Sequence, residues 1–368
     1  MRGWGLCLLA IGCGADAGTP YAWVLPAGFP EPVVPNDNPL TVEKIELGRH
    51  LFYDRRLSFN ETTSCGSCHD QAKAFADGRP VSEGATGDRT ARNAMGLGNV
   101  AWFGTYTWAN PVLETLEQQA LVPMLGERPL ELGTFRDVEG ILDRFRGDPV
   151  SQAQFLAAFP EEEDPYTLAN VARALASFQR ILVSGGSSFD RWFHQGDGAE
   201  FSAAAQRGFQ LFNSERFECY HCHAGPTFST SFYSVESTQR PYDFHNTGLY
   251  DLDGQGAYPA NNWGLKELTQ AEGDMGKFRV PSLRNVALTA PYLHDGSAET
   301  LAEVLLVYAD GGRVVNEGPY AGDGRTNPHK SPLVRAFPMT DAERDDLISF
   351  LESLSDPGFV SDPRFAPP

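Results

Sequence analysis

Apolar side chains recur every three to four residues in several segments of the chain, which is the spacing of an amphipathic helix. One such segment follows Thr41, where the order Thr-Val-Glu-Lys has the form of a capping box at a helix start. Others cover residues 165–183 and 301–308, and the last begins at Thr340 with a second such box. Alternating patterns typical of strands are hard to find. The hydrophobic pattern therefore predicts an all-α fold.

A short pattern, G-x-x-L-F, occurs twice in the predicted helices. It covers residues 48–52 and again residues 208–212. Repetition of this kind indicates two copies of one structural unit. Residues 184–200, which contain two adjacent glycines, separate the copies, so we expect one domain at 41–200 and a second at 201–368. Long connecting loops are expected at residues 70–110 and 224–285.

Each copy is followed by a C-x-x-C-H motif. In this spacing two thiols can add to the two vinyl groups of one haem, and the imidazole of the next residue reaches the iron. A pair of disulfides or a cysteine-rich zinc site is the alternative, but neither explains the histidine that ends both motifs. We therefore expect two cytochrome c-like domains, each with one covalently attached haem c. The six residues are Cys65, Cys68 and His69 in the first copy, and Cys219, Cys222 and His223 in the second.

The formal net charge of the chain is −19, which argues against binding to nucleic acid or to anionic membrane surfaces. An acidic surface favours a basic or neutral protein partner, and it also serves solubility alone. Four of the six cysteines belong to the haem motifs. The remaining two lie in the leader described next, so no structural disulfide is expected in the mature protein.

The first 13 residues contain one arginine and a short apolar run, which is typical of an export signal. The ending Ala-Ile-Gly-Cys resembles a bacterial lipoprotein processing site with Cys13 as the lipidated residue, and an ordinary cleaved signal is the alternative. Residues 14–40 are rich in proline and glycine, and we interpret them as an extended linker or a strap over the first domain. No other run is long enough to span a bilayer. We expect a periplasmic or otherwise exported protein that contacts a membrane only through such a lipid.

The histidine content limits what can bind the first iron opposite His69. No histidine lies between His69 and His194, and Met95 and Met124 are the only methionines in that interval. We therefore expect a five-coordinate iron that is open to water or peroxide. If Met95 or Met124 bound it instead, the first haem would be a simple electron carrier.

An ordered series of phrases from about residue 40 to residue 355 resembles the bacterial di-haem cytochrome c peroxidase/MauG family. The resemblance implies that the first haem is high-spin and reacts with hydrogen peroxide, and that the second is six-coordinate and low-spin. The phrases are LGRHLF at 47–52, RNA at 92–94, Trp108, EQQA at 117–120, VPSLRNV at 280–286 and LTAPYLHDGS at 288–297.

The same resemblance suggests the second ligand of the second iron. Peroxidases of the family place a methionine in the helix after the P-Y-x-H-D-G motif, whereas this chain has Tyr308 there, fourteen residues beyond His294. Tyrosine at this place is similar to the MauG/MbnH-like branch. A phenolate is a hard anionic donor that stabilises oxidised iron. A buried Tyr308 with Met275 or Met339 as the ligand is the alternative.

Further roles follow from the resemblance alone. Trp108 corresponds to a tryptophan between the two haems that carries electrons from one to the other, and the alternative is an ordinary core aromatic residue. Glu131 corresponds to an acid in the peroxide pocket that takes a proton from bound peroxide, and Gln119 shares this pocket. His245 and His294 are candidates for bonding haem propionates.

The resemblance also implies one calcium ion between the haems. Its ligands would be the side-chain amide of Asn93 and the backbone carbonyls of Thr289 and Pro291. All three are hard oxygen donors, which calcium prefers.

One departure from the family concerns the route to a protein partner. MauG has a tryptophan two residues before the second haem motif, whereas this chain has Phe217 there. Phenylalanine is much harder to oxidise than tryptophan. The route must therefore differ, and the candidates are Tyr220 or another surface tryptophan or tyrosine such as Trp263.

Together these features predict a di-haem c-type oxidoreductase. Hydrogen peroxide would produce a bis-high-valent haem state, and this state would oxidise an aromatic side chain, in the first instance tryptophan, of an exported partner protein by long-range electron transfer. One alternative is a cytochrome c peroxidase that reduces hydrogen peroxide with electrons from a small donor cytochrome. The other alternative is a non-enzymatic di-haem electron carrier.

Overall fold

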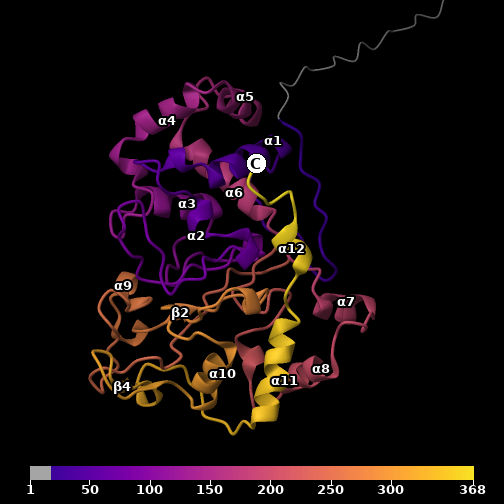
Figure 1. Cartoon of the computed structure of the whole chain (residues 1–368), viewed down its shortest axis with the longest axis vertical. Helices are drawn as coiled ribbons and strands as arrows, with labels where there is room; N and C mark the ends of the chain where they lie inside the picture. Colours follow the sequence, from indigo (N-terminus) through magenta and orange to yellow (C-terminus); the bar gives the residue numbers. More distant parts are fainter. Residues whose placement is uncertain (1–17) are drawn as a thin grey trace, which may run out of the picture.

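The computed structural model describes residues 18–368 as a mostly helical chain whose helices form two groups, one above the other in Figure 1. The predicted signal at residues 1–13, with its Cys13, lies outside the described residues. Within residues 18–368, no helix combines the length and the apolar character that a membrane span requires.

In the first group, most helices begin at a threonine or aspartate whose side chain accepts a hydrogen bond from the backbone of the first turn. This group covers the chain up to residue 180 and includes the first cysteine motif. Its helices are α1 (Val42–Tyr53), α2 (Cys65–Cys68), α3 (Leu116–Leu125), α4 (Val138–Arg146), α5 (Pro149–Ala158) and α6 (Leu168–Arg180).

The second group follows the same capping rule, with serine, threonine or aspartate before most of its helices. Its final short helix returns to the first group, as Figure 1 shows in yellow. The helices are α7 (Ser188–Gln195), α8 (Ala203–Phe212), α9 (Lys266–Thr269), α10 (Leu301–Ala309), α11 (Asp341–Glu352) and α12 (Pro357–Ser361).

Strands are few and short, so the all-α expectation holds except for two small antiparallel pairs. The first pair is β1 (Phe244–His245) with β2 (Phe278–Arg279), and the second is β3 (Val314–Val315) with β4 (Gly322–Asp323). Short 3₁₀ turns complete the structure at Arg55–Leu57, Gln71–Lys73, Val100–Trp102, Thr134–Arg136, Cys219–His221, Glu272–Asp274, Val286–Leu288 and Gly324–Thr326.

The capping box predicted at Thr340 is confirmed, whereas the one at Thr41 is wrong in part. Thr340 and Glu343 exchange both hydrogen bonds of the box. Thr41 does cap α1, because its hydroxyl accepts a bond from the Lys44 backbone at 3.3 Å. Lys44 cannot return the bond, since its side chain carries no acceptor.

The repeated G-x-x-L-F pattern places a glycine where two helices cross. Gly48 in α1 lies so close to α6 that a Cβ atom there would be 1.9 Å from the carbonyl oxygen of Ala174. Gly208 in α8 lies equally close to α11, where a Cβ would be 2.0 Å from the carbonyl oxygen of Asp346. Only a residue without a side chain permits this approach, so the two copies share one helix-crossing geometry.

Each helix pair supports its own hydrophobic core, and the segment at the end of the chain crosses from the second group to the first core. Phe189 of α7 packs in the second core, and Phe359 and Phe365 pack in the first. The predicted domain boundary at residue 200 stays a prediction, although α7 before it already belongs to the second core.

Buried polar side chains join the two groups. Asn99 and Ser184 exchange two hydrogen bonds of 2.8 and 2.9 Å. Asn285 donates to the Ser184 hydroxyl at 2.9 Å and accepts from the Asp356 backbone at 2.8 Å. Because all four residues are buried and bonded to one another, the joint positions both groups rigidly.

Replacing Gly48 or Gly208 by alanine should lower the free energy of unfolding by about 1–3 kcal/mol, because the new methyl group forces the crossing helices apart. Gly273→Ala is the matched control, since a Cβ there meets nothing within 4 Å. Chemical denaturation followed by circular dichroism measures the difference. Wild-type stability in both crossing variants would contradict this packing.

Candidate active site

Three neighbouring cavities lie between and within the two helix groups. The first cavity, of about 300 Å³, contains Cys65, Cys68 and His69. The second cavity, of about 390 Å³, contains the corresponding second motif, and a middle cavity of about 100 Å³ shares lining residues with both. Trp108 and Arg279 line all three cavities. Most of the residues predicted for the haem and calcium sites therefore line one of three adjoining cavities.

The first motif forms the short helix α2, and its histidine is held by the backbone that follows. His69 Nδ1 lies 2.7 Å from the carbonyl oxygen of Phe75, which fixes the ring and leaves Nε2 directed away from that bond. Burial lowers the pKa of His69, so the imidazole is neutral. A neutral, oriented imidazole is the form that binds iron.

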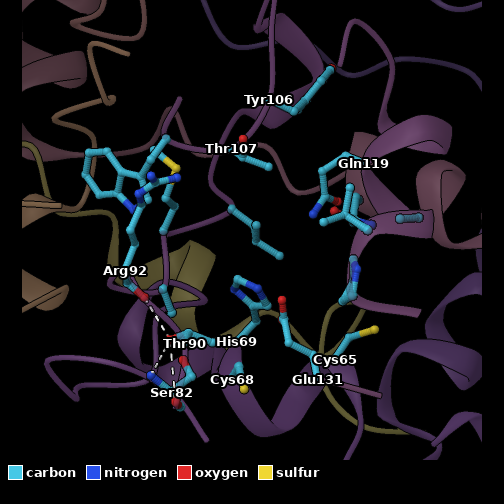
Figure 2. Close-up of a pocket in the computed structure, with 18 of the residues that line it drawn as sticks. Cys65, Cys68, His69, Ser82, Thr90, Arg92, Tyr106, Thr107, Gln119 and Glu131 are labelled. Atoms are coloured by element: carbon cyan, nitrogen blue, oxygen red, sulfur yellow. Dashed lines mark hydrogen bonds between the residues drawn. The ribbon is translucent and has the colours of Figure 1, made fainter. Parts of the chain in front are cut away.

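Gln119 of α3 and Glu131 line the first cavity together with His69, as Figure 2 shows. The Glu131 carboxylate makes no side-chain hydrogen bond to the described part of the chain, and burial raises its pKa. A carboxyl group of this kind can exchange a proton with a small ligand in the cavity.

The alternative methionine ligands of the first iron are poorly placed. Met124 is fully buried in the first core and does not line the cavity. Met95 lines it, but its backbone carbonyl faces His69 and its sulfur lies 3.4 Å from Arg279 Nη2. These positions favour a first iron without a second protein ligand, which stays a prediction.

The second motif repeats this arrangement. His223 Nδ1 lies 3.1 Å from the carbonyl oxygen of Phe228, and burial lowers the pKa of His223 to about 4. Tyr308 of α10 lines the same cavity. Its hydroxyl makes no hydrogen bond within residues 18–368, and burial strongly raises its pKa. Met275 and Met339, the alternative ligands, pack in hydrophobic clusters and do not line this cavity.

Two buried basic groups indicate that the cavities suit a cofactor with carboxylates. Arg279 is 3 % exposed, forms no ion pair within the described residues, and burial lowers its pKa to about 10. His294 is buried and stacked on Phe278 with ring centroids 3.6 Å apart, and its Nε2 has no partner among the described residues. Leaving such groups unpaired is costly, and haem propionates would supply the missing acceptors. The residues present therefore fit haem.

His245 differs from His294 because it already has partners. Its Nε2 lies 2.6 Å from Asp243 and its Nδ1 lies 3.2 Å from Ser331. The hydrogen bond to Asp243 raises the pKa of His245 to about 10. Of the two predicted propionate partners, His294 is thus the one that lacks an acceptor.

The three predicted calcium ligands all line the middle cavity. Asn93, Thr289 and Pro291 are brought together there from distant parts of the sequence. Trp108 Nε1 donates to the Asn93 carbonyl at 2.8 Å, which links the tryptophan to the same wall. The described residues contain no cluster of three or more His, Cys, Asp or Glu side chains suited to a metal ion. The predicted calcium ligands are amide and carbonyl oxygens, which do not belong to these four side-chain types. The absence of such a cluster therefore does not test the calcium ion, which stays a prediction.

Sequence reasoning missed Arg279, which no motif singles out. The sequence offers no local signal for it, because Lys277 and Arg284 in the same segment are also basic. The backbone carbonyls of Phe75 and Phe228 were also missed, because side-chain motifs do not reveal backbone acceptors.

Two motif histidines, each oriented in its own cavity and joined through shared residues, define a c-type cytochrome with two haem sites. A family model described as di-haem cytochrome c peroxidase matches residues 42–198. The chain is 34% identical to cytochrome-c peroxidase IdrP1 of Denitromonas iodatirespirans, over 98% of this chain and 93% of that protein. It is 33% identical to methylamine utilization protein MauG of Methylorubrum extorquens, over 95% of this chain and 90% of that protein.

A solved structure described as a MauG-like protein associated with microbial copper homeostasis superposes with a TM-score of 0.92. Its sequence is 47% identical, and the match covers 95% of this chain and 99% of that one. The chain belongs to the di-haem cytochrome c peroxidase/MauG family. It is therefore a peroxide-dependent oxidoreductase, its family implies two haem c groups, and family members are periplasmic.

Arg279→Gln in the haem-loaded protein should lower a haem midpoint potential by about 60 mV, a tenfold change for a one-electron couple. The reason is that a nearby positive charge favours the reduced iron. Spectroelectrochemical titration measures the shift. Arg279→Lys keeps the charge and should retain most of the wild-type potential, while Arg335→Gln, at the exposed rim of the second cavity, is the control. An unchanged potential in Arg279→Gln would exclude the proposed contact with propionates.

Proposed function

We propose that this enzyme uses hydrogen peroxide to oxidise an aromatic side chain, in the first instance tryptophan, of an exported partner protein by long-range electron transfer. The haem pair, when bound, supplies the redox chemistry by storing the two oxidising equivalents of one peroxide. The observation that carries the proposal is the position of Tyr308, which lines the cavity of His223 while Met275 and Met339 do not. A phenolate ligand there stabilises oxidised iron, whereas a thioether favours an electron reservoir.

The first cavity provides the peroxide site in this proposal. Hydrogen peroxide would bind in the cavity that His69 lines, where Glu131 would take a proton at its carboxylate and Gln119 would orient the ligand. The raised pKa of Glu131 suits this exchange, because burial disfavours the ionised carboxylate and so makes it a stronger proton acceptor.

Residues between the cavities connect the two sites. Trp108 lines all three cavities and its indole is fixed by the bond to Asn93, so it can carry electrons between the haems. One calcium ion held by Asn93, Thr289 and Pro291 would stiffen this wall. Export, with lipid attachment at Cys13, places the enzyme beside an exported partner.

A cytochrome c peroxidase that takes electrons from a small cytochrome is the second candidate. It is favoured by relatives with that name, such as IdrP1. The non-enzymatic carrier is set aside, because several matched relatives are named as peroxidases.

Tyr308→Met should shorten the lifetime of the peroxide-oxidised state at least about tenfold, or about 1.4 kcal/mol, because the hard anionic ligand is lost. Stopped-flow spectroscopy measures the lifetime, and electron paramagnetic resonance of the resting wild type should show one high-spin and one low-spin ferric centre. Tyr292→Phe, which changes another tyrosine of the same cavity, is the control. A long-lived oxidised state in Tyr308→Met would contradict Tyr308 as the ligand and favour the peroxidase. Two low-spin centres in the resting wild type would indicate an unforeseen ligand at the first iron.

Glu131→Gln should slow the reaction with peroxide by about 10²-fold or more, the usual contribution of a positioned proton acceptor. The wild-type rate should rise with pH through a midpoint above the ordinary value of 4.5, because burial disfavours the ionised base, and this rise should vanish in the variant. Rates measured between pH 4 and pH 8 test the rise in the wild-type rate and its loss in Glu131→Gln. At the midpoint of the rise, about half of the wild-type Glu131 side chains are ionised. Glu83→Gln, an exposed carboxylate at the same cavity, is the control. Equal pH profiles would remove Glu131 from the mechanism.

A further inference from the structure

The two cysteine motifs differ in the residues between their cysteines, and the structure gives this difference a consequence. The first motif contains Gly66, and the ring of Tyr53 covers it so closely that a Cβ at Gly66 would lie 2.5 Å from Tyr53 Cδ1. The Tyr53 hydroxyl in turn donates to the carbonyl of Phe365 at 2.6 Å. The chain itself therefore covers the outer side of the first motif.

The second motif instead presents aromatic side chains at the surface. Tyr220 is half-buried and packs at the edge of the second core, and His221 beside it is exposed. Their rings lie 4.3 Å apart between centroids, at an interplanar angle of 30°. Tyr220 is bonded directly to Cys219, which lines the second cavity. An oxidisable ring thus connects the haem attachment site with the surface.

A proton acceptor stands at the phenol of Tyr220. Its hydroxyl donates a hydrogen bond of 3.0 Å to Glu215 Oε1, and Glu215 is exposed. A phenol that loses an electron also loses its proton, so a carboxylate already bonded to the hydroxyl removes the need for solvent rearrangement. An oxidisable ring and a proton acceptor, the two groups that a reversible tyrosine oxidation needs, are therefore in place.

The other candidate routes lack one of these parts. Phe217 is 5 % exposed, with the Arg216 guanidinium 4.6 Å from its ring centroid and Phe337 against it, and its ring carries no ionisable group. Trp263 is 38 % exposed and is not part of the second motif, and like Tyr220 it lines none of the three cavities. Tyr220 differs because it is bonded directly to Cys219, which lines the second cavity. The comparison leaves Tyr220 as the exposed route from the second motif.

We propose that Tyr220 is the residue through which this enzyme withdraws electrons from its partner, with Glu215 as its proton acceptor. The inference rests on the proposed function. Tyr220 passes one electron to the oxidised haem pair while its phenolic proton moves to Glu215 Oε1. The tyrosyl radical then takes an electron from the partner's aromatic side chain, and the proton returns from Glu215. Two such cycles consume the two equivalents of one peroxide and remove two electrons from the partner.

The charges around Tyr220 indicate what kind of partner fits. Glu215 and Glu218 lie beside it, and Arg216 in the same segment is paired with Glu343. The surface around the ring is therefore negative, in agreement with the net charge of −19. It suits a partner whose oxidised aromatic residue is flanked by lysine or arginine.

The test compares wild type with Tyr220→Phe and Glu215→Gln in the haem-loaded protein, with Tyr242→Phe as the control. Tyr242 is 64 % exposed and has no hydrogen bond to a carboxylate within the described residues. Two equivalents of peroxide are added, and the tripeptides Lys-Trp-Lys and Glu-Trp-Glu serve as electron donors. Electron paramagnetic resonance detects a tyrosyl radical, and mass spectrometry locates oxidation or dityrosine at Tyr220.

We expect a tyrosyl signal in wild type and Tyr242→Phe and none in Tyr220→Phe. Oxidation of Lys-Trp-Lys should fall about a hundredfold in Tyr220→Phe and in Glu215→Gln, the scale of one positioned proton-transfer group. Lys-Trp-Lys should react faster than Glu-Trp-Glu in wild type. Unchanged resting spectra in the variants will show that both haem sites remain intact.

Two results would overturn the inference in different ways. If wild type stores the oxidising equivalents and Tyr220→Phe oxidises Lys-Trp-Lys at the wild-type rate, the route through Tyr220 is wrong and the proposed function stands. If wild type stores no oxidising equivalents, the proposed function and this inference fail together.

Discussion

The structure depends on one buried positive charge, the guanidinium of Arg279, at the meeting point of three cavities. A buried cation without a counter-ion is costly, which favours an anionic group beside it. Carboxylates of a bound cofactor meet this need. The same residue donates to the Thr107 carbonyl, and its backbone bonds to Trp108, so cofactor binding and the geometry of the tryptophan are linked. Charge neutralisation and the electron path are thus parts of one arrangement.

The two copies of the helix-and-motif unit have the same architecture, and the residues that differ between their cavities determine their different chemistry. Gly48 and Gly208 give the two copies the same helix crossing, and His69 and His223 are held by equivalent backbone carbonyls. Differences arise opposite these histidines. Glu131 faces the first cavity and Tyr308 the second, so similar scaffolds offer one site for a small ligand and one for a phenol.

The sequence allowed the helical class, the repeat and both motifs to be predicted, because each rests on local spacing. Trp108, Asn93 and Thr289 could be grouped only through a family resemblance, since they are far apart in the chain and meet through tertiary packing. Arg279 could not be predicted, because its role depends on the absence of an ion-pair partner among the described residues, which only the tertiary structure reveals. The short strands and the helices α3, α4, α5, α7, α9 and α12 were missed, since two-residue pairs and helices of four to ten residues leave little periodic signal.

The segment that contains α12 covers the first core although it lies far downstream of both motifs. The Gln71 side chain, two residues after His69, donates to the Asp362 carbonyl at 2.9 Å, and Phe359 and Phe365 pack nearby. Since a polypeptide is synthesised from its amino end, Cys65 and Cys68 emerge long before this cover exists. The first domain is therefore complete only once this late segment has been synthesised and has docked on it.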